Sequence, residues 1–171
     1  MLVVADSSPL IYLSRIRLLH ILPTLFGDVV VPKAVWDETV ERRPSAPGIE
    51  SLRQASWIRI VDDLVSSADL GLDPGETAAI LVAESLHADL LLIDERLGRA
   101  VAQERGLTVR GTLGVLVQAR QSGVLAALKP VLDALNAEGF RIAPALVRHA
   151  LEQVGETQSS GASVQRARST T

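Results

Sequence analysis

Four acidic residues from distant parts of the chain carry the clearest chemical signal in the sequence: Asp6, Glu38, Glu76 and Asp94. Asp6 directly follows the apolar run LVVA, and Asp94 directly follows DLLLI, and each run predicts a buried strand. Parallel strands end at one edge of a sheet, where ligand crevices also lie, so both aspartates are expected at that edge. Glu38 and Glu76 lie in the early turns of predicted helices that begin near the same edge.

A cluster of four carboxylates is unfavourable by itself, because each negative charge raises the pKa of its neighbours. A bound cation relieves this repulsion. The set offers oxygen ligands only, with no His or Cys, which points to Mg²⁺ or Mn²⁺. Such an ion lowers the pKa of a bound water and neutralises charge on a phosphate. The four acids therefore predict a metal site that can cut a phosphodiester backbone.

Each acid also has a purely structural interpretation. Glu76 stands three residues after Asp73, the spacing of a capping box. Asp94 can cap the helix that follows it. Glu38 has an acidic neighbour, Asp37, and the sequence leaves open which of the two points inward. The joint placement of the acids, rather than any one of them, favours the metal site.

The elements that must position these acids alternate between strand and helix. Ser8-Pro9 and Asp73-Pro74 are helix-start signals, and Gly106 is typical of a helix end. The expected strands are residues 2–5, 29–31, 57–61, 89–93 and 108–110, and the expected helices are 8–25, 32–42, 49–55, 73–87 and 95–105, with two or three more within 112–154. This alternation predicts an α/β fold with a parallel sheet covered on both faces.

Length and composition suit one domain with a sizeable core, since 47% of the 171 residues are hydrophobic. We expect a folded body over residues 1–155 and a disordered Ser/Thr/Gln-rich tail over 156–171. The lack of cysteine excludes disulfides, thiolate metal sites and cysteine nucleophiles. No apolar run is long enough to span a bilayer, and no signal-peptide pattern is present, so a soluble, cytoplasmic protein without membrane association is expected. The net charge of −3 argues against a broadly basic nucleic-acid-binding protein.

Several motifs, taken in their order, resemble the PIN-domain ribonucleases, and among them the uncharacterised, toxin-like branch. The matching stretches are VVADSSPLIYLSRI, VPKAVWDETV, LDPGETAAILVA, LLIDERLGRAVA and GTLGVLVQARQSGVL, which together span roughly residues 1–150. The resemblance implies a PIN-like (flavodoxin-like) three-layer sandwich with a five-stranded parallel sheet. It also implies an acidic metal site formed by Asp6, Glu38, Glu76 and Asp94. Many members have Asp where this chain has Glu76, whose longer side chain places the carboxylate differently.

Other residues near these acids are candidates for contact with substrate. The resemblance places small polar residues at Ser7 and Thr112 beside the site. Arg96 and Arg99, on the helix after Asp94, are candidates for holding backbone phosphates, with a solvated helix face as the alternative interpretation.

The predicted metal site and the resemblance together imply a Mg²⁺- or Mn²⁺-dependent endoribonuclease. The resemblance further implies the toxin of a toxin–antitoxin pair, with a small antitoxin protein in the acidic groove. One alternative is a non-catalytic PIN-like domain that binds RNA or protein. Another is a phosphotransfer receiver with Asp6 as nucleophile, but Ser8 stands where a second acid is needed, and no well-placed Lys follows the fifth strand. The apolar segments 107–122 and 125–135 suit either a homodimer face or a larger core.

Overall fold

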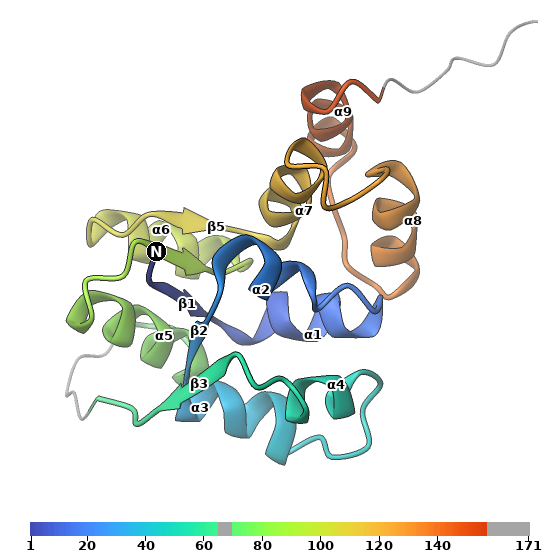
Figure 1. The fold of residues 1–171 in the computed structure, drawn as a ribbon. Coiled ribbons are helices and arrows are strands. Elements are labelled where there is room, and N and C mark those ends of the chain that lie inside the picture. Colours follow the sequence, from blue (N-terminus) through green and yellow to red (C-terminus); the bar gives the residue numbers. More distant parts are fainter. Residues whose placement is uncertain (65–69, 157–171) are drawn as a thin grey trace, which may run out of the picture.

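A computed structural model describes residues 1–64 and 70–156. Five strands form one sheet in the order β3-β2-β1-β4-β5, and all of the strand pairs are parallel (Figure 1). The strands are β1 (Val3–Ala5), β2 (Val29–Pro32), β3 (Ile58–Val61), β4 (Leu90–Leu92) and β5 (Val109–Arg110). The predicted α/β class with a five-stranded parallel sheet is confirmed, and every strand lies where the sequence pattern places it.

The sheet is arranged so that the most apolar strands are central. All residues of β1 and β4 are buried, as a parallel strand covered on both faces requires. At the β3 edge, Arg59 and Ile60 are exposed. The order of strands reverses between β1 and β4, the kind of point at which α/β sheets bind their ligands.

Helices lie on both faces of the sheet, and the last three helices lie together beyond its β5 edge. Helix α1 packs with α4 and α7, whereas α5 packs with α6, and α7, α8 and α9 stand together beyond β5 (Figure 1). The helices are α1 (Ser7–Arg15), α2 (Ile21–Phe26), α3 (Lys33–Trp36), α4 (Ile49–Arg53), α5 (Pro74–Ser85), α6 (Arg96–Glu104), α7 (Thr112–Gln121), α8 (Lys129–Ala137) and α9 (Pro144–Gln153). Among the described residues, every helix is too short or too polar to span a bilayer.

Residues 8–25, predicted as one helix, form two. The chain leaves α1 through Arg17, whose φ of 60° is in the left-handed region that ends a helix. The N–H of Leu18 then donates to the carbonyl of Leu13 at 2.8 Å and closes the helix end. The prediction of a continuous helix is wrong. Arg seldom adopts a positive φ, so an Arg in the sequence does not indicate a helix end.

The predicted helix 32–42 is present but changes its pitch. It starts as α3 and continues as a π-helix, η1 (Asp37–Glu41), in which the N–H of Arg42 donates to the carbonyl of Asp37 at 2.9 Å. A π turn adds one residue to a helical turn and rotates the residues that follow, a distortion found often at functional sites. The π turn begins here at Asp37 and Glu38, the two acids for which the sequence does not decide which side chain points inward.

The last described residue, Glu156, is bonded to the start of α8. Glu156, expected in the tail, accepts hydrogen bonds from the backbone N–H groups of Leu128 and Lys129 at 2.9 Å and from Arg120 Nε at 2.8 Å. These bonds satisfy free N–H groups at the start of α8. The rest of the predicted tail, residues 157–171, lies outside the described residues.

The apolar residues of α7 and α8 belong to the core. Val115, Leu116, Leu128, Leu132 and Leu135 are all at most 4% exposed. Packing within the chain therefore accounts for the apolar pattern of segments 107–122 and 125–135 without a second subunit.

Candidate functional site

Asp6 lies where β1 passes into α1. Its N–H donates to the carbonyl of Leu92 at 2.9 Å and extends the β1–β4 pairing. Asp6 then occupies the N-cap position of α1, which begins at Ser7, one residue before the predicted start. Its side chain makes no capping bond, is 2% exposed, and has an Oδ1 atom without a hydrogen-bond partner. A buried carboxylate oxygen without a partner is costly and calls for a ligand or a functional reason.

The surroundings of Asp6 disfavour its charged form. Burial and the negative charges of Asp73, Glu76 and Glu38 raise the pKa of Asp6 from 3.8 to about 7, and a hydrogen bond from the backbone N–H of Ser7 opposes the change. Two of the other predicted acids, together with Asp73, are thus close enough to Asp6 to act on its charge.

Glu76 stands in the first turn of α5, where Asp73 caps the helix. Asp73 Oδ1 accepts a hydrogen bond from the Glu76 N–H at 2.8 Å, as the capping interpretation predicts. The Glu76 side chain, however, is 7% exposed, and its Oε1 has no hydrogen-bond partner. This atom lies against α6, because a Cβ atom at Gly98 would be only 2.8 Å from it. Burial, and then the charge of Asp73, raises the pKa of Glu76. Helix capping accounts for Asp73 but not for the Glu76 carboxylate.

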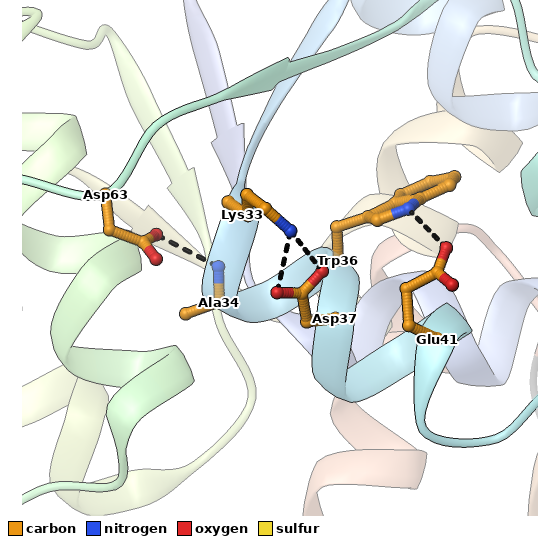
Figure 2. Close-up of polar contacts among 6 residues, drawn as sticks. All are labelled: Lys33, Ala34, Trp36, Asp37, Glu41 and Asp63. Carbon is orange, nitrogen blue, oxygen red and sulfur yellow. Dashed lines mark hydrogen bonds and ion pairs between the residues drawn. The ribbon is translucent and has the colours of Figure 1, made fainter.

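The structure distinguishes Glu38 from Asp37. Asp37 turns to Lys33, with Oδ1 2.7 Å from Nζ (Figure 2). Glu38 instead approaches the start of α5, since a Cβ atom at Gly75 would lie 2.6 Å from its Oε2. Burial and the charge of Asp73 raise the pKa of Glu38. Glu38 is therefore the acid of this pair that joins Asp6 and Asp73.

The helix that carries Glu38 is held at both ends by side chains. Asp63, in the loop after β3, accepts a hydrogen bond from the Ala34 N–H at 3.0 Å, and Trp36 Nε1 donates to Glu41 Oε1 at 3.3 Å (Figure 2). A helix of only a few residues is marginal by itself, so these contacts help to keep Glu38 in place.

Asp94 follows β4 but faces a different set of groups. The N–H of Thr112 donates to Asp94 Oδ1 at 2.7 Å, and the Thr112 hydroxyl donates to Oδ2 at 2.6 Å. A Cβ atom at Gly111 would lie 2.8 Å from both Asp94 Oδ1 and Arg99 Nη1. Burial raises the pKa of Asp94, and the Thr112 bonds and the Arg99 charge oppose this. Glu95, not Asp94, occupies the N-cap position of α6, so the capping interpretation of Asp94 is wrong.

The register of the sheet explains why the two aspartates have different neighbours. Ala5 pairs with Leu92, so that Asp6 stands opposite Ile93 and Asp94 lies one residue further on. Successive side chains of a strand point to opposite faces of the sheet. The offset of one residue accounts for an Asp6 side chain among the acids of α5 and η1, and for an Asp94 side chain bonded to α7.

The predicted substrate residues have distinct positions. Thr112 is fully buried, and its hydroxyl donates a hydrogen bond to Asp94. The backbone N–H of Ser7 donates a hydrogen bond to Asp6. Arg99 lies beside Asp94 and Gly111, whereas Arg96 is exposed at the start of α6.

Three residues near the acids were not among the predicted site residues. Asp73 is exposed, and its charge raises the pKa values of Asp6, Glu38 and Glu76. Arg42 and Arg43, at the end of η1, lower the pKa of Glu38. All three line a groove of about 530 Å³ together with Glu38 and Gly75. The corresponding sequence signals are ERRP and LDPGE, in which the spacing indicates a helix cap at Asp73.

Within residues 1–64 and 70–156, no three His, Cys, Asp or Glu side chains stand close enough together to hold a metal ion as they are. The chemistry of the site nevertheless fits a hard divalent cation. Its donors are carboxylate oxygens, two of which, on Asp6 and Glu76, are buried without a partner. Mg²⁺ keeps several waters and commonly takes only one or two carboxylates together with substrate phosphates, so a closed cage is not required.

Comparison with protein families gives a match over most of the chain. A family model described as a PIN domain matches residues 2–156, which is nearly the whole described part of the chain. No curated protein matches the chain. PIN domains are generally nucleases and typically use divalent metals. Because the match covers far more than half of the chain, and the parallel sheet agrees with it, this protein belongs to the PIN-domain family.

Proposed function

We propose that this protein is a Mg²⁺- or Mn²⁺-dependent ribonuclease that hydrolyses phosphodiester bonds of RNA. The observation that carries the proposal is the buried Asp6 carboxylate, which has an unpartnered oxygen and lies among the charges of Asp73, Glu76 and Glu38. Such an arrangement destabilises the folded protein unless a cation offsets the negative charge. This cost favours a functional reason for the arrangement over a structural one.

Asp6 and Glu76 are the residues proposed to hold the ion, because each has a buried oxygen free to accept it. Glu38 lies close enough to Asp6 to act on its charge, and Asp94 is proposed to contribute from the neighbouring strand end. When bound there, a divalent ion supplies a water of lowered pKa and neutralises charge on the phosphate. Thr112 contributes by holding Asp94 in one orientation through two hydrogen bonds.

Arginines stand on both sides of the acids. Arg42 and Arg43 line the groove next to Glu38, and Arg99 lies next to Asp94. Guanidinium groups bind phosphate oxygens bidentately, so we propose that these residues hold the RNA backbone across the acidic site. Arg96 is exposed and can add a further contact.

The resemblance to the toxin-like branch also suggests the biological role of the protein. We propose a cytoplasmic toxin whose activity is blocked by a small antitoxin protein covering the acidic cluster. The neighbouring gene tests this point. A short upstream reading frame that encodes a DNA-binding N-terminus is expected, and its absence from the genomes that carry this chain argues against the toxin.

The nuclease itself is tested by conservative substitutions and an RNA-cleavage assay with Mg²⁺ or Mn²⁺. Asp6→Asn and Glu38→Gln are expected to reduce cleavage to background while the circular-dichroism spectrum is unchanged. Asp37→Asn is the matched control for Glu38→Gln, since Asp37 is paired with Lys33 and should leave cleavage intact. Full activity of purified Asp6→Asn protein would sink the mechanism.

The alternative of a non-catalytic RNA- or protein-binding domain has a direct test as well. Calorimetric titration of the wild-type protein with Mn²⁺ should give a binding isotherm that Asp6→Asn abolishes. Absence of such an isotherm, together with absence of cleavage, favours the non-catalytic domain.

A further inference from the structure

A second groove, of about 330 Å³, lies on the Asp94 side of the site. It is bounded by β5, α7 and α9, and by Arg99 of α6. Its lining includes Arg99, Arg110, Leu113, Leu146, His149 and Gln153. Within the described residues this lining contains cationic, amide and apolar side chains but no acid.

The groove is continuous with the surroundings of Asp94. Arg99 and Gly111 both line it, and a Cβ atom at Gly111 would be 2.8 Å from Asp94 Oδ1 and from Arg99 Nη1. Glycine at this position therefore leaves the space through which Arg99 and Asp94 approach the β5–α7 corner. A ligand chain that crosses the acids meets this groove directly next to Asp94.

Arg110 is held along the same wall. A Cβ atom at Gly114 would lie 2.7 Å from Arg110 Cγ, so the glycine lets the Arg110 stem lie against the first turn of α7. Its Nη1 donates to the amide oxygen of Gln118. Since this partner is neutral, the bond orients the guanidinium without cancelling its positive charge.

The apolar part of the groove comes from β5, α7 and α9. Leu146 is 54% exposed, although it is a large hydrophobic residue, and half-buried Leu113 lines the same groove. Cationic groups next to exposed apolar surface suit a nucleotide, whose phosphate pairs with guanidinium while its base lies on apolar or aromatic side chains. The positive groove also complements an anionic chain that enters from the acidic site, which favours a nucleotide over a protein segment.

We propose that this groove binds the nucleotide next to the cleaved bond of a single-stranded RNA. Its phosphate pairs with Arg99 and Arg110, and its base lies on Leu113, Leu146 and His149. This inference rests on the proposed ribonuclease function and adds α9 to the substrate-binding surface.

Two variants on α9 test the groove, each with a matched control on the same helix. Leu146→Glu introduces a negative charge into the groove, and Ala145→Glu introduces the same charge at an exposed neighbouring position. His149→Ala removes a lining side chain, and Arg148→Ala removes one that lines a different groove, with Phe140. All four are combined with Asp6→Asn to prevent cleavage. Fluorescence anisotropy then measures affinity for a random-sequence, single-stranded ten-nucleotide RNA.

Leu146→Glu is expected to weaken RNA binding about tenfold or more, and His149→Ala about three- to tenfold, because each disturbs a contact of the order of one stacked base. The two controls are expected to change the affinity by less than about twofold, because charges on the exposed part of the helix are screened by salt.

The failures of this inference and of the proposed function are distinguishable. Unchanged affinity in Leu146→Glu and His149→Ala, together with metal-dependent RNA cleavage by the wild-type protein, overturns the groove assignment and leaves the ribonuclease intact. A wild-type protein that neither binds nor cleaves RNA overturns both. If Leu146→Glu instead abolishes self-association in sedimentation equilibrium without changing RNA affinity, the groove is a contact between copies of the chain, and the assignment is overturned.

Discussion

At the scale of single residues, the four predicted acids differ in the hydrogen bonds they make. Both carboxylate oxygens of Asp94 accept bonds from Thr112. Asp6 and Glu76 each keep one buried oxygen without a partner. Asp94 is therefore fixed in orientation, while Asp6 and Glu76 are the groups that gain most from a cation.

Asp6→Asn is expected to stabilise the metal-free protein at pH 8. The pKa of Asp6 is raised to about 7 in the folded state, so between pH 4 and 7 the folded protein holds a proton that the unfolded chain has lost. The contribution of Asp6 to stability should therefore fall as pH rises through this range, by at most about 4 kcal/mol, and the variant should lose correspondingly less stability than the wild-type protein. Urea unfolding in EDTA from pH 4 to 8 measures the difference.

Metal provides the control for this prediction. At pH 8, Mg²⁺ should raise the unfolding midpoint of the wild-type protein and not that of Asp6→Asn, because a ligand stabilises only the state that binds it. If the stabilities of the two proteins change in parallel across the pH range, the surroundings of Asp6 do not raise its pKa.

At the scale of elements, three glycines near helix starts make room for the carboxylates. Gly75 lies against Glu38, Gly98 against Glu76, and Gly111 against Asp94. They belong to the first turn of α5, the first turn of α6 and the N-cap of α7. Helix starts also favour nearby negative charge through their free N–H groups. The carboxylates thus lie against the backbone of these glycines, in space that a Cβ atom would otherwise occupy.

Gly98→Ala should reduce catalysis more than stability. The new Cβ would lie 2.8 Å from Glu76 Oε1 and 2.7 Å from Ile93 Cδ1, so the flexible Glu76 carboxylate must move. We expect RNA cleavage to fall by about 10- to 100-fold, since small misplacements at an active site have effects of this order. The free energy of unfolding should change by less than about 1 kcal/mol, because alanine's better helix propensity offsets the crowding.

The reverse substitution on the same helix is the control. Ala100→Gly, at an exposed position of α6, should lower the free energy of unfolding by about 1 kcal/mol and leave cleavage unchanged. Equal activity of Gly98→Ala and wild type would mean that the Glu76 carboxylate has no role at its present position.

At the scale of the whole molecule, an acidic protein must bind an anionic chain. The net charge is −3, yet Arg42 and Arg43 stand on one side of the acids and Arg99 and Arg110 on the other. Arginines thus flank the acids on both sides of the proposed RNA path.

Four phosphate contacts predict a logarithmic salt dependence of single-stranded RNA affinity with a slope of about −3. The double variant Arg42→Ala, Arg43→Ala should reduce the magnitude of this slope by about 1.4, since each lost contact removes about 0.7. Anisotropy titrations of the Asp6→Asn protein between about 50 and 200 mM KCl measure it. Arg148→Ala should leave the slope unchanged, and an unaltered slope in the double variant would place the RNA elsewhere.

Self-association remains a prediction at this scale. Helices α7 and α8 bury most of their large apolar side chains within the chain, and the exposed large apolar residues include Leu97 and Leu146. Any contact between copies must therefore use other surfaces than the apolar faces of α7 and α8.

The sequence by itself determined the alternation of strands and helices, the chain positions of Asp6 and Asp94 after central strands, and membership of the PIN family. These depend on local patterns, because apolar runs, Pro and Gly signals and motif spacing are readable without knowing which segments meet. The sequence pattern does not predict the helix break at Arg17 or the π turn at Asp37, since neither residue type favours the conformation it adopts.

Only the tertiary structure decided how the acids are grouped. That Glu38 rather than Asp37 turns inward depends on the π turn and on Lys33. That Asp94 binds Thr112 depends on the one-residue offset between β1 and β4 and on the neighbouring β5. Strand order and register are properties of the assembled sheet, and they direct side chains of adjacent strand ends to different faces.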